Sequence, residues 1–369
     1  MATTADYGFG DFQYPRGWFM VAGADEVAER PVPVRYFGED MVLYRGESGT
    51  AHLVSAYCPH MGAHLARNTT SYIIRDGRQI EGESIRCPFH GWRFGPDGRC
   101  TAIPYSDFVP GAARLKTWPV VERAGIIWMW HDPEGQEPDY PLPDFDGHYD
   151  QPGWVNWKID LLGDLDIHGC EIVDNMADLG HMTPIHGAQE CIYFANRFDG
   201  HTVHQYFRVV NRGLAGGGAA PSELDTWYTG PGILQSRMDS HMPAFMMVAN
   251  TPIEDGRTRV WHALMVRVND GSRALTDEER ASAFEYQEML RLGLVQDLEI
   301  WANKEFCVNP LAVPSDGPYG KLRTWYRQFF NDRARAADIQ QRVNGFVVTL
   351  DDGKGPPLPA ENCAELSPA

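Results

Sequence analysis

Two short motifs, each with one cysteine and one histidine, constrain the fold of this chain more than any other feature of its sequence. Cys58-Pro-His60 precedes Cys87-Pro-Phe-His90. A 2Fe–2S cluster can be held by two thiolates on one iron and two imidazoles on the other, and each of two loops must then supply one ligand of each kind. The proline after each cysteine stiffens its turn. The motifs therefore predict a domain in which two tight loops meet around such a cluster.

A structural zinc ion is the alternative use of two cysteines and two histidines. Zinc loops usually pair like with like, as C-x2-4-C and H-x3-5-H, whereas each half here is mixed. His64 could replace His60, but C-x5-H would give the first loop the wrong reach. The chain has seven cysteines. We expect the five outside the motifs to be small buried hydrophobic residues rather than ligands.

The pattern of apolar runs predicts two domains joined by an extended connection. Short β-like runs broken by Gly, Pro and Asp, among them SYIIR, indicate an all-β domain over 12–131. Residues 132–153 are rich in Pro, Gly and acidic side chains and are typical of a linker. In 154–369 we expect a helix up to Pro184, strands around 201–210, 233–250 and 258–268, and a long helix from Thr276 to Glu305. Helices packed on an antiparallel sheet make this an α+β domain.

A second set of candidate ligands lies in the sequence Asp178-x2-His181-x4-His186. On a helix, Asp174, Asp178 and His181 would share one face. Pro184 would end that helix and let His186 turn back toward His181. Two imidazoles and one carboxylate leave open positions on an iron ion, as in the non-haem Fe(II) oxygenases. Either histidine could instead be an ordinary hydrogen-bonded residue, because the motif alone is weak.

Asp297 is the candidate for the third ligand. It lies on the predicted long helix beside the apolar stripe of Leu290, Leu294 and Trp301, so its carboxylate should point inward. A buried carboxylate is costly unless it is paired or bound to a metal. Glu299 falls on the opposite side of the helix and should be solvated.

Charge and hydropathy exclude several classes of partner. Lys and Arg total 32 against 50 Asp and Glu, a net charge of −18, so there is no excess of positive charge to neutralise phosphates or anionic lipid. The N-terminus lacks the pattern of a signal peptide, and no apolar run has the length of a membrane span. We therefore expect a cytoplasmic protein that binds neither nucleic acid nor membrane.

The motifs together resemble those of the Rieske non-haem iron oxygenases, and more closely the oxygenase components of 3-ketosteroid 9α-hydroxylases. The similarity extends over most of the chain and includes three motifs in the same order: CPH and CPFHGWRF, then DNMADLGHMTPIH, then QDLEIW. The resemblance implies an all-β Rieske domain followed by a helix-grip (START-like) catalytic domain. It also implies one 2Fe–2S cluster and one Fe(2+) per chain.

The resemblance also assigns roles to individual residues. Cys58, His60, Cys87 and His90 would hold the cluster, and His181, His186 and Asp297 the catalytic iron. In the family, the residue matching Asp178 bridges a ligand histidine to a cluster histidine of the neighbouring subunit in a head-to-tail homotrimer. Asn175 matches a polar position near the iron. Segment 68–85 is longer than in the ketosteroid enzymes, and we expect an added β-hairpin with Asp76-Gly77 at its turn.

The function implied is that of a terminal monooxygenase. Electrons from an NAD(P)H-dependent reductase, with or without a ferredoxin, would support insertion of one atom of O2 into a hydrophobic, steroid-like substrate. An aromatic-compound hydroxylase or an O- or N-demethylase would need the same metals. A lipid-binding carrier with a structural zinc is the non-enzymatic alternative. A Rieske protein that only transfers electrons would leave the second domain unexplained.

Overall fold

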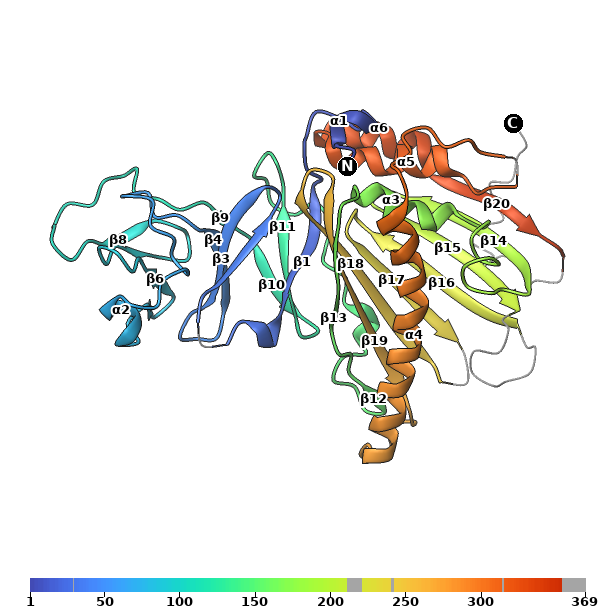
Figure 1. Cartoon of the computed structure of the whole chain (residues 1–369), viewed down its shortest axis with the longest axis horizontal. Helices are drawn as coiled ribbons and strands as arrows, with labels where there is room; N and C mark the ends of the chain where they lie inside the picture. Colours follow the sequence, from blue (N-terminus) through green and yellow to red (C-terminus); the bar gives the residue numbers. More distant parts are fainter. Residues whose placement is uncertain (29, 211–220, 240–241, 314, 354–369) are drawn as a thin grey trace. The chain divides into compact units, whose positions relative to one another are not determined.

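The computed structural model describes residues 1–353 except 29, 211–220, 240–241 and 314 (Figure 1). Contacts within the chain divide it into two compact units. Trp18–Asp139 forms one, and Met1–Gly17 together with Tyr140–Ala369 forms the other. Residues 12–17, which the sequence placed in the first domain, are thus grouped with the second unit. The N-terminal segment contains one short helix, α1 (Thr4–Tyr7).

The unit Trp18–Asp139 consists mainly of short strands, as the sequence predicted. These strands form three sheets. In sheet order these are β1 (Gly17–Gly23), β11 (Ile126–His131) and β10 (Val120–Arg123), then β2 (Val32–Tyr36), β3 (Glu39–Arg45), β4 (Ala51–Ser55) and β9 (Thr117–Trp118), and last β5 (Ile80–Glu81), β6 (Ser84–Arg86), β7 (Arg93–Phe94) and β8 (Cys100–Ala102). A single 3-10 turn, η1 (Ala24–Glu26), follows β1.

The prediction of a β-hairpin with Asp76-Gly77 at its turn is wrong. Residues 72–75, also expected as a strand, form a helical turn, α2 (Tyr72–Arg75). The Ser71 hydroxyl accepts a hydrogen bond from the Ile73 amide and so caps this turn, and Gly77 ends it at φ +66°. The hairpin lies further along, between β5 and β6, with Gly82 at φ +57° in its turn.

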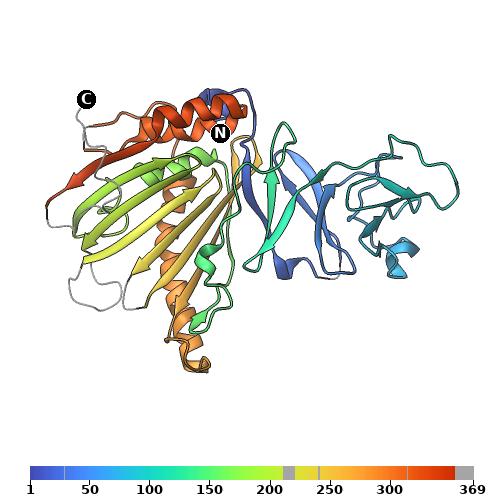
Figure 2. The ribbon, with the colours of Figure 1, turned by 180° about the vertical axis from the view of Figure 1, so that it is seen from behind.

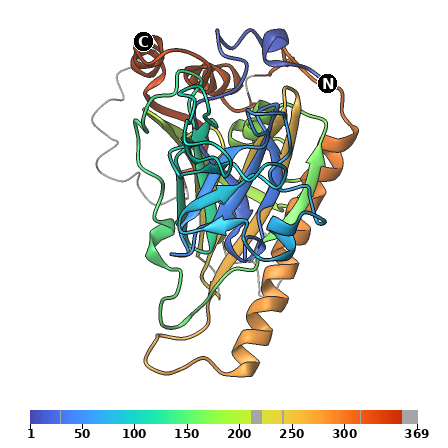
Figure 3. The same ribbon diagram turned by 90° about the vertical axis from the view of Figure 1, so that its left-hand side faces the viewer.

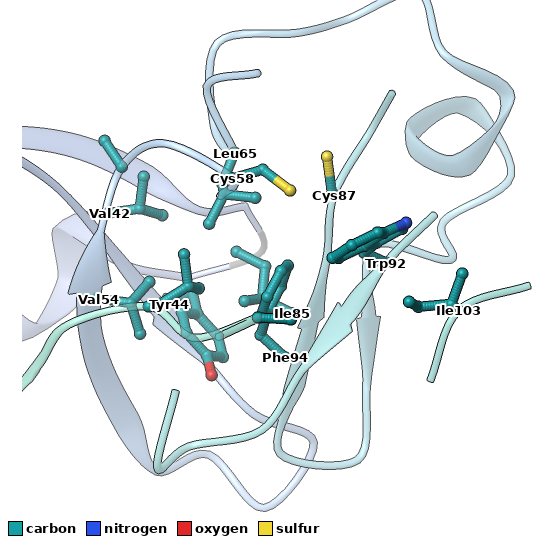
Figure 4. Close-up of a cluster of buried hydrophobic side chains, with 13 residues drawn as sticks. Val42, Tyr44, Val54, Cys58, Leu65, Ile85, Cys87, Trp92, Phe94 and Ile103 are labelled. Carbon is teal, nitrogen blue, oxygen red and sulfur yellow. The ribbon is translucent and has the colours of Figure 1, made fainter. Parts of the chain in front are cut away.

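The unit has a buried core beneath the two Cys/His loops. Figure 4 shows side chains from several strands packed together, with the sulfur atoms of Cys58 and Cys87 directed toward each other at its edge. Tyr44, Leu65 and Phe94 are fully buried in this core. The loops are therefore anchored on a packed base.

The second unit is built on one nine-stranded sheet. Its strands in sheet order are β12 (Trp154–Val155), β19 (Arg257–Arg267), β18 (Ala244–Glu254), β17 (Ile233–Asp239), β16 (Pro221–Thr229), β15 (Thr202–Val210), β14 (Glu190–Asp199) and β20 (Gly345–Asp351), and β13 (Asp160–Leu165) also pairs with β19. The paired strands are antiparallel. The strand expected over 233–250 is two strands, β17 and β18, and β12, β13, β14, β16 and β20 were not foreseen.

One long helix, α4 (Asp277–Asn303), covers one face of this sheet, and Figure 2 shows the opposite face. Figure 3 shows α4 as a layer beside the strands. The helix begins at the predicted cap, because the Thr276 hydroxyl accepts from the Glu279 amide at 3.2 Å. Its buried side includes Leu298 and Trp301. A long helix on a curved antiparallel sheet confirms the helix-grip prediction.

The remaining helical segments are short. They are η2 (Phe145–Gly147), α3 (Gly169–Val173), η3 (Asp174–Ala177), α5 (Tyr319–Arg327), η4 (Gln328–Phe330) and α6 (Arg333–Val343). The helix expected to continue to Pro184 already ends at Ala177, because Asp178 has an extended backbone with φ −94° and ψ 92°. No helix among the described residues has the length and apolar character needed to cross a membrane.

Candidate metal centres

The two Cys/His loops have the same backbone design. In each, the cysteine amide donates to the carbonyl five residues on, Cys58 to Ala63 at 2.9 Å and Cys87 to Trp92 at 2.8 Å. The amide of the glycine four residues on then donates back to the cysteine carbonyl. These glycines, Gly62 and Gly91, have φ values of +71° and +75°. Two equivalent turns thus present one thiol and one imidazole each.

The four candidate ligands have the burial expected of a cluster site. Cys58 and Cys87 are 2% and 1% exposed and form no disulfide. A hydrogen bond from the Cys58 thiol lowers the pKa of Cys87 to about 6. The rings of His60 and His90 lie 4.6 Å apart and are half-buried. The thiols therefore face the interior and the imidazoles face the surface.

The four residues have the character of metal ligands, and their spacing favours a two-iron cluster over a single zinc ion. His60 Nδ1 is buried and has no hydrogen-bond partner among the described residues, as expected of a nitrogen that binds a metal. One zinc ion would bring all four ligand atoms close together. The ligand atoms of these four residues do not all lie within 4.8 Å of one another. Among the described residues, the group that meets this criterion is His181, His186 and Asp297. Cys58, His60, Cys87 and His90 therefore fit a 2Fe–2S cluster, in which the cysteines bind one iron and the histidines bind the other.

The structure brings His181, His186 and Asp297 together although they lie on different segments. The two imidazole rings are 5.0 Å apart, and His186 Nε2 lies 3.3 Å from Asp297 Oδ1. Asp297 is 6% exposed on the inner side of α4, whereas Glu299 is exposed, as predicted. Two imidazoles and a carboxylate within reach of one point form the ligand set of a non-haem ferrous site.

The histidines reach this position by turns rather than along a helix face. The Ile185 amide donates to the His181 carbonyl at 2.9 Å, and the Gly187 amide donates to Thr183 at 3.1 Å. The expectation that Asp174, Asp178 and His181 share one helical face is therefore wrong. Asp178, just after η3, redirects the chain so that His181 and His186 face α4.

Asp178 lies against His181 and controls which of its nitrogens is free. One carboxylate oxygen is 3.3 Å from His181 Nδ1, and the other accepts from the His181 amide at 3.3 Å. Burial opposes ionisation of Asp178, but contacts with His181 and a hydrogen bond from Tyr319 hold its pKa below the ordinary value. Since Nδ1 faces this carboxylate, Nε2 is the His181 nitrogen available to a metal.

A cavity of about 210 Å³, with mostly polar and charged residues in its lining, reaches two of the three candidate ligands. Its lining includes Asn175, Asp178, His181, Asp297 and Tyr319. Asn175 thus borders the site, and its backbone carbonyl accepts a hydrogen bond from the Gln205 side chain at 3.2 Å. Sequence reasoning missed Tyr319, because an isolated tyrosine carries no motif that would indicate a neighbour of Asp178.

Two apolar clusters include residues that are close to Asp297 and to His181 in the sequence. Leu298 and Trp301, beside Asp297, pack with Leu162, Leu234, Met246 and Leu294. Leu179 and Met182, beside His181, pack with Phe194 and Phe207. Several of these side chains are only partly buried. Met246 of β18 belongs to the first of these clusters.

Family models match both units. The Rieske [2Fe-2S] domain matches residues 17–119, and the 3-ketosteroid 9alpha-hydroxylase C-terminal domain matches residues 129–330. The chain is a Rieske-type oxygenase of the 3-ketosteroid 9α-hydroxylase family. Its cofactors are accordingly a 2Fe–2S cluster and a non-haem iron. Membership sets aside both the zinc-stapled lipid carrier and the Rieske protein that only transfers electrons.

Curated relatives support this assignment over most of the chain. A Rhodococcus rhodochrous protein named as a probable 3-ketosteroid-9-alpha-monooxygenase, oxygenase component, is 34% identical, covering 94% of this chain and 87% of its own length. A counterpart from Mycolicibacterium smegmatis is 30% identical, covering 87% and 84%. A Bombyx mori protein named cholesterol 7-desaturase is 29% identical, covering 87% and 70%.

Solved structures share the fold at lower identity. NdmA of Pseudomonas putida CBB5 with caffeine has a TM-score of 0.66 at 16% identity, covering 90% of this chain and 95% of its own. Dicamba monooxygenase bound to dicamba has a TM-score of 0.60 at 17% identity, covering 90% and 99%. These similarities confirm the predicted two-part fold.

Proposed function

We propose that this Rieske oxygenase is the terminal component of a monooxygenase that hydroxylates a hydrophobic, steroid-like polycyclic substrate. Cys58, His60, Cys87 and His90 hold the cluster. His181, His186 and Asp297 hold the iron. The observation that carries the proposal is the convergence of the last three residues, whose ligand atoms all lie within 4.8 Å of one another.

The residues around each site have distinct tasks. When bound, the cluster relays single electrons from an NAD(P)H-dependent reductase, with or without a ferredoxin, and the ferrous iron supplies the site for O2 activation. Asp178 orients the His181 ring through Nδ1. The apolar side chains beside the ligands exclude water from the substrate side.

We further propose a cytoplasmic homotrimer in which Asp178 also contacts a cluster histidine of the next subunit. The side of the cluster loops that carries the histidines has exposed apolar residues, Met61 at 65%, Phe89 at 60% and Tyr105 at 61%. Such exposure is typical of a surface that is covered in an assembly. Asn175, which borders the same cavity as Asp178, completes the polar side of the site.

A sterol-sized substrate is favoured by the names of the relatives together with the apolar cluster that contains Leu298, the residue after Asp297. The bacterial relatives are named for 3-ketosteroids and the insect relative for cholesterol. Leu234, Met246 and Leu294 are partly buried against the cluster that contains Leu298 and Trp301, and they offer apolar surface to a flat hydrocarbon skeleton. An aromatic-compound hydroxylase and an O- or N-demethylase remain the alternatives within the fold.

The test measures the products formed under 18O2 in the presence of a donor reductase. A tetracyclic 3-ketosteroid, caffeine and dicamba are supplied as substrates in separate reactions. We expect steroid product with one labelled oxygen and no formaldehyde. Formaldehyde release from caffeine or dicamba, with no steroid product, would replace the steroid hydroxylase by a demethylase. Asp297→Ala serves as the control for turnover that does not depend on the iron.

A further inference from the structure

The candidate iron ligands come from two segments of the chain, and contacts outside the ligands themselves must hold these segments in position. His181 and His186 follow η3, whereas Asp297 lies on α4, near the end of that helix at Asn303. No covalent link fixes one segment against the other. The segment that follows α4 is, however, joined to α3 and η3 by a set of charged side chains.

Glu171 of α3 is the first member of this set. Its carboxylate is almost fully buried, with 2% of the residue exposed. It accepts a hydrogen bond from the Tyr7 hydroxyl, pairs with the Lys304 ammonium and accepts from the Cys307 amide at 2.9 Å. Burial opposes its ionisation, but these three donors hold the pKa of Glu171 below the ordinary value. Glu171 therefore anchors both Lys304 and Cys307.

Arg323 of α5 is the second member, and it binds both segments at once. Its Nε donates to Asp174 Oδ1 at 3.0 Å and its Nη2 to Oδ2 at 2.5 Å. Its Nη1 donates to the carbonyls of Cys307 and Val308, each at 2.7 Å. A planar guanidinium can satisfy these acceptors together because its donors point in fixed, divergent directions.

This set borders the iron site without supplying a ligand. Glu171, Asp174, Lys304, Cys307 and Arg323 line the same cavity as His181 and Asp297. A buried ion pair contributes little net stability compared with apolar side chains of similar size, because desolvating the charges is costly. Its defined geometry is the property that apolar packing would not reproduce.

We propose that Arg323 and Glu171 are positioning residues of the mononuclear iron site, which fix the segment after α4 against α3 and η3 so that Asp297 meets His181 and His186. This inference rests on the proposed iron ligands. Neither residue touches the iron. Each acts by holding the segment that bears a ligand.

The test compares Arg323→Lys with Arg327→Lys in the full-length protein carrying its cluster and iron. Arg327 is exposed one turn further along α5 and is the matched control. Lysine keeps the charge of Arg323 but cannot bond Asp174 and both carbonyls together. We expect a ferrous chelator to remove the mononuclear iron about 10- to 100-fold faster from Arg323→Lys, while the visible spectrum of the cluster stays unchanged.

A spectroscopic measurement separates positioning from general loosening. With the cluster oxidised, the EPR spectrum of the nitric oxide adduct reports the symmetry of the ferrous site. We expect a changed rhombicity in Arg323→Lys and in Glu171→Gln, and the wild-type spectrum in Arg327→Lys. Glu171→Gln gives a second route to the answer if Arg323→Lys does not fold.

The outcomes distinguish the inference from the proposal on which it rests. If Asp297→Ala loses the iron but both Arg323→Lys and Glu171→Gln keep wild-type release rates and spectra, the positioning role is wrong and the ligand set stands. If Asp297→Ala keeps its iron, the ligand set itself is wrong.

Discussion

The two metal centres of this chain are assembled in different ways. The proposed cluster ligands come from two loops with the same internal hydrogen bonds, and both loops rest on one core. The proposed ligands of the mononuclear site come from a turn region and a long helix that are distant in sequence. The first site is specified locally and the second by tertiary packing. The two should therefore respond differently to mutation.

The largest expected effect is a reciprocal loss of metal. Cys87→Ala should abolish the cluster and its sulfide but leave the iron at His181, His186 and Asp297, since each site lies in its own unit. Asp297→Ala should leave about two irons and two sulfides per chain with an intact cluster spectrum. Metal and acid-labile sulfide analysis of anaerobically purified protein measures both. Loss of both metals in both variants would contradict independent assembly.

A pH dependence is expected from the unit that holds the mononuclear site. Burial lowers the pKa of His168 to about 4, and its Nδ1 accepts from the Cys170 amide at 3.2 Å. The unfolded chain binds a proton near pH 6.5 that the folded chain does not, so stability falls as pH drops from about 6.5 to 4, by up to about 3 kcal/mol. Denaturant unfolding at pH 7, 5.5 and 4.5 should show a smaller decline in His168→Gln. Equal declines in both proteins would assign the effect to other groups.

The shared design of the cluster loops can be tested at its glycines. An added Cβ at Gly91 would lie 2.9 Å from Pro104 Cγ, whereas at Gly62 nothing lies within 4 Å. Gly62→Ala should cost about 1 kcal/mol through its positive φ alone, and Gly91→Ala about 2–3 kcal/mol. The denaturant midpoint for loss of the cluster absorbance measures both. A larger effect at Gly62 would show that the two loops are less alike in energy than in geometry.

The smallest effect is expected at the start of α4. Thr276→Ala removes the cap on the Glu279 amide and should cost about 1 kcal/mol, whereas Thr276→Ser should retain it. Because the cap lies at the opposite end of the helix from Asp297, iron content should be unchanged. Iron loss in Thr276→Ala alone would mean that the whole helix, rather than its C-terminal contacts, sets the ligand position.

Local sequence determined much of this protein. The Cys/His spacing, the capped amphipathic helix over 276–305 and the inward position of Asp297 were all readable, because turns, caps and helical faces depend on residues a few positions apart. The same locality explains the errors. Residues 72–75 carry β-branched side chains typical of a strand, yet Ser71 caps them into a helical turn. The region before Pro184 resembles a helix, yet it ends at Ala177.

Only the tertiary structure decided what surrounds the iron ligands. The sequence named His181, His186 and Asp297 separately, but their approach depends on the packing of α4 against the sheet. Tyr319, Arg323 and Glu171 carry no motif, and their roles follow from partners distant in sequence. Short-range patterns therefore specify the ligands and their loops, whereas long-range burial and charge pairing specify the geometry in which those ligands meet.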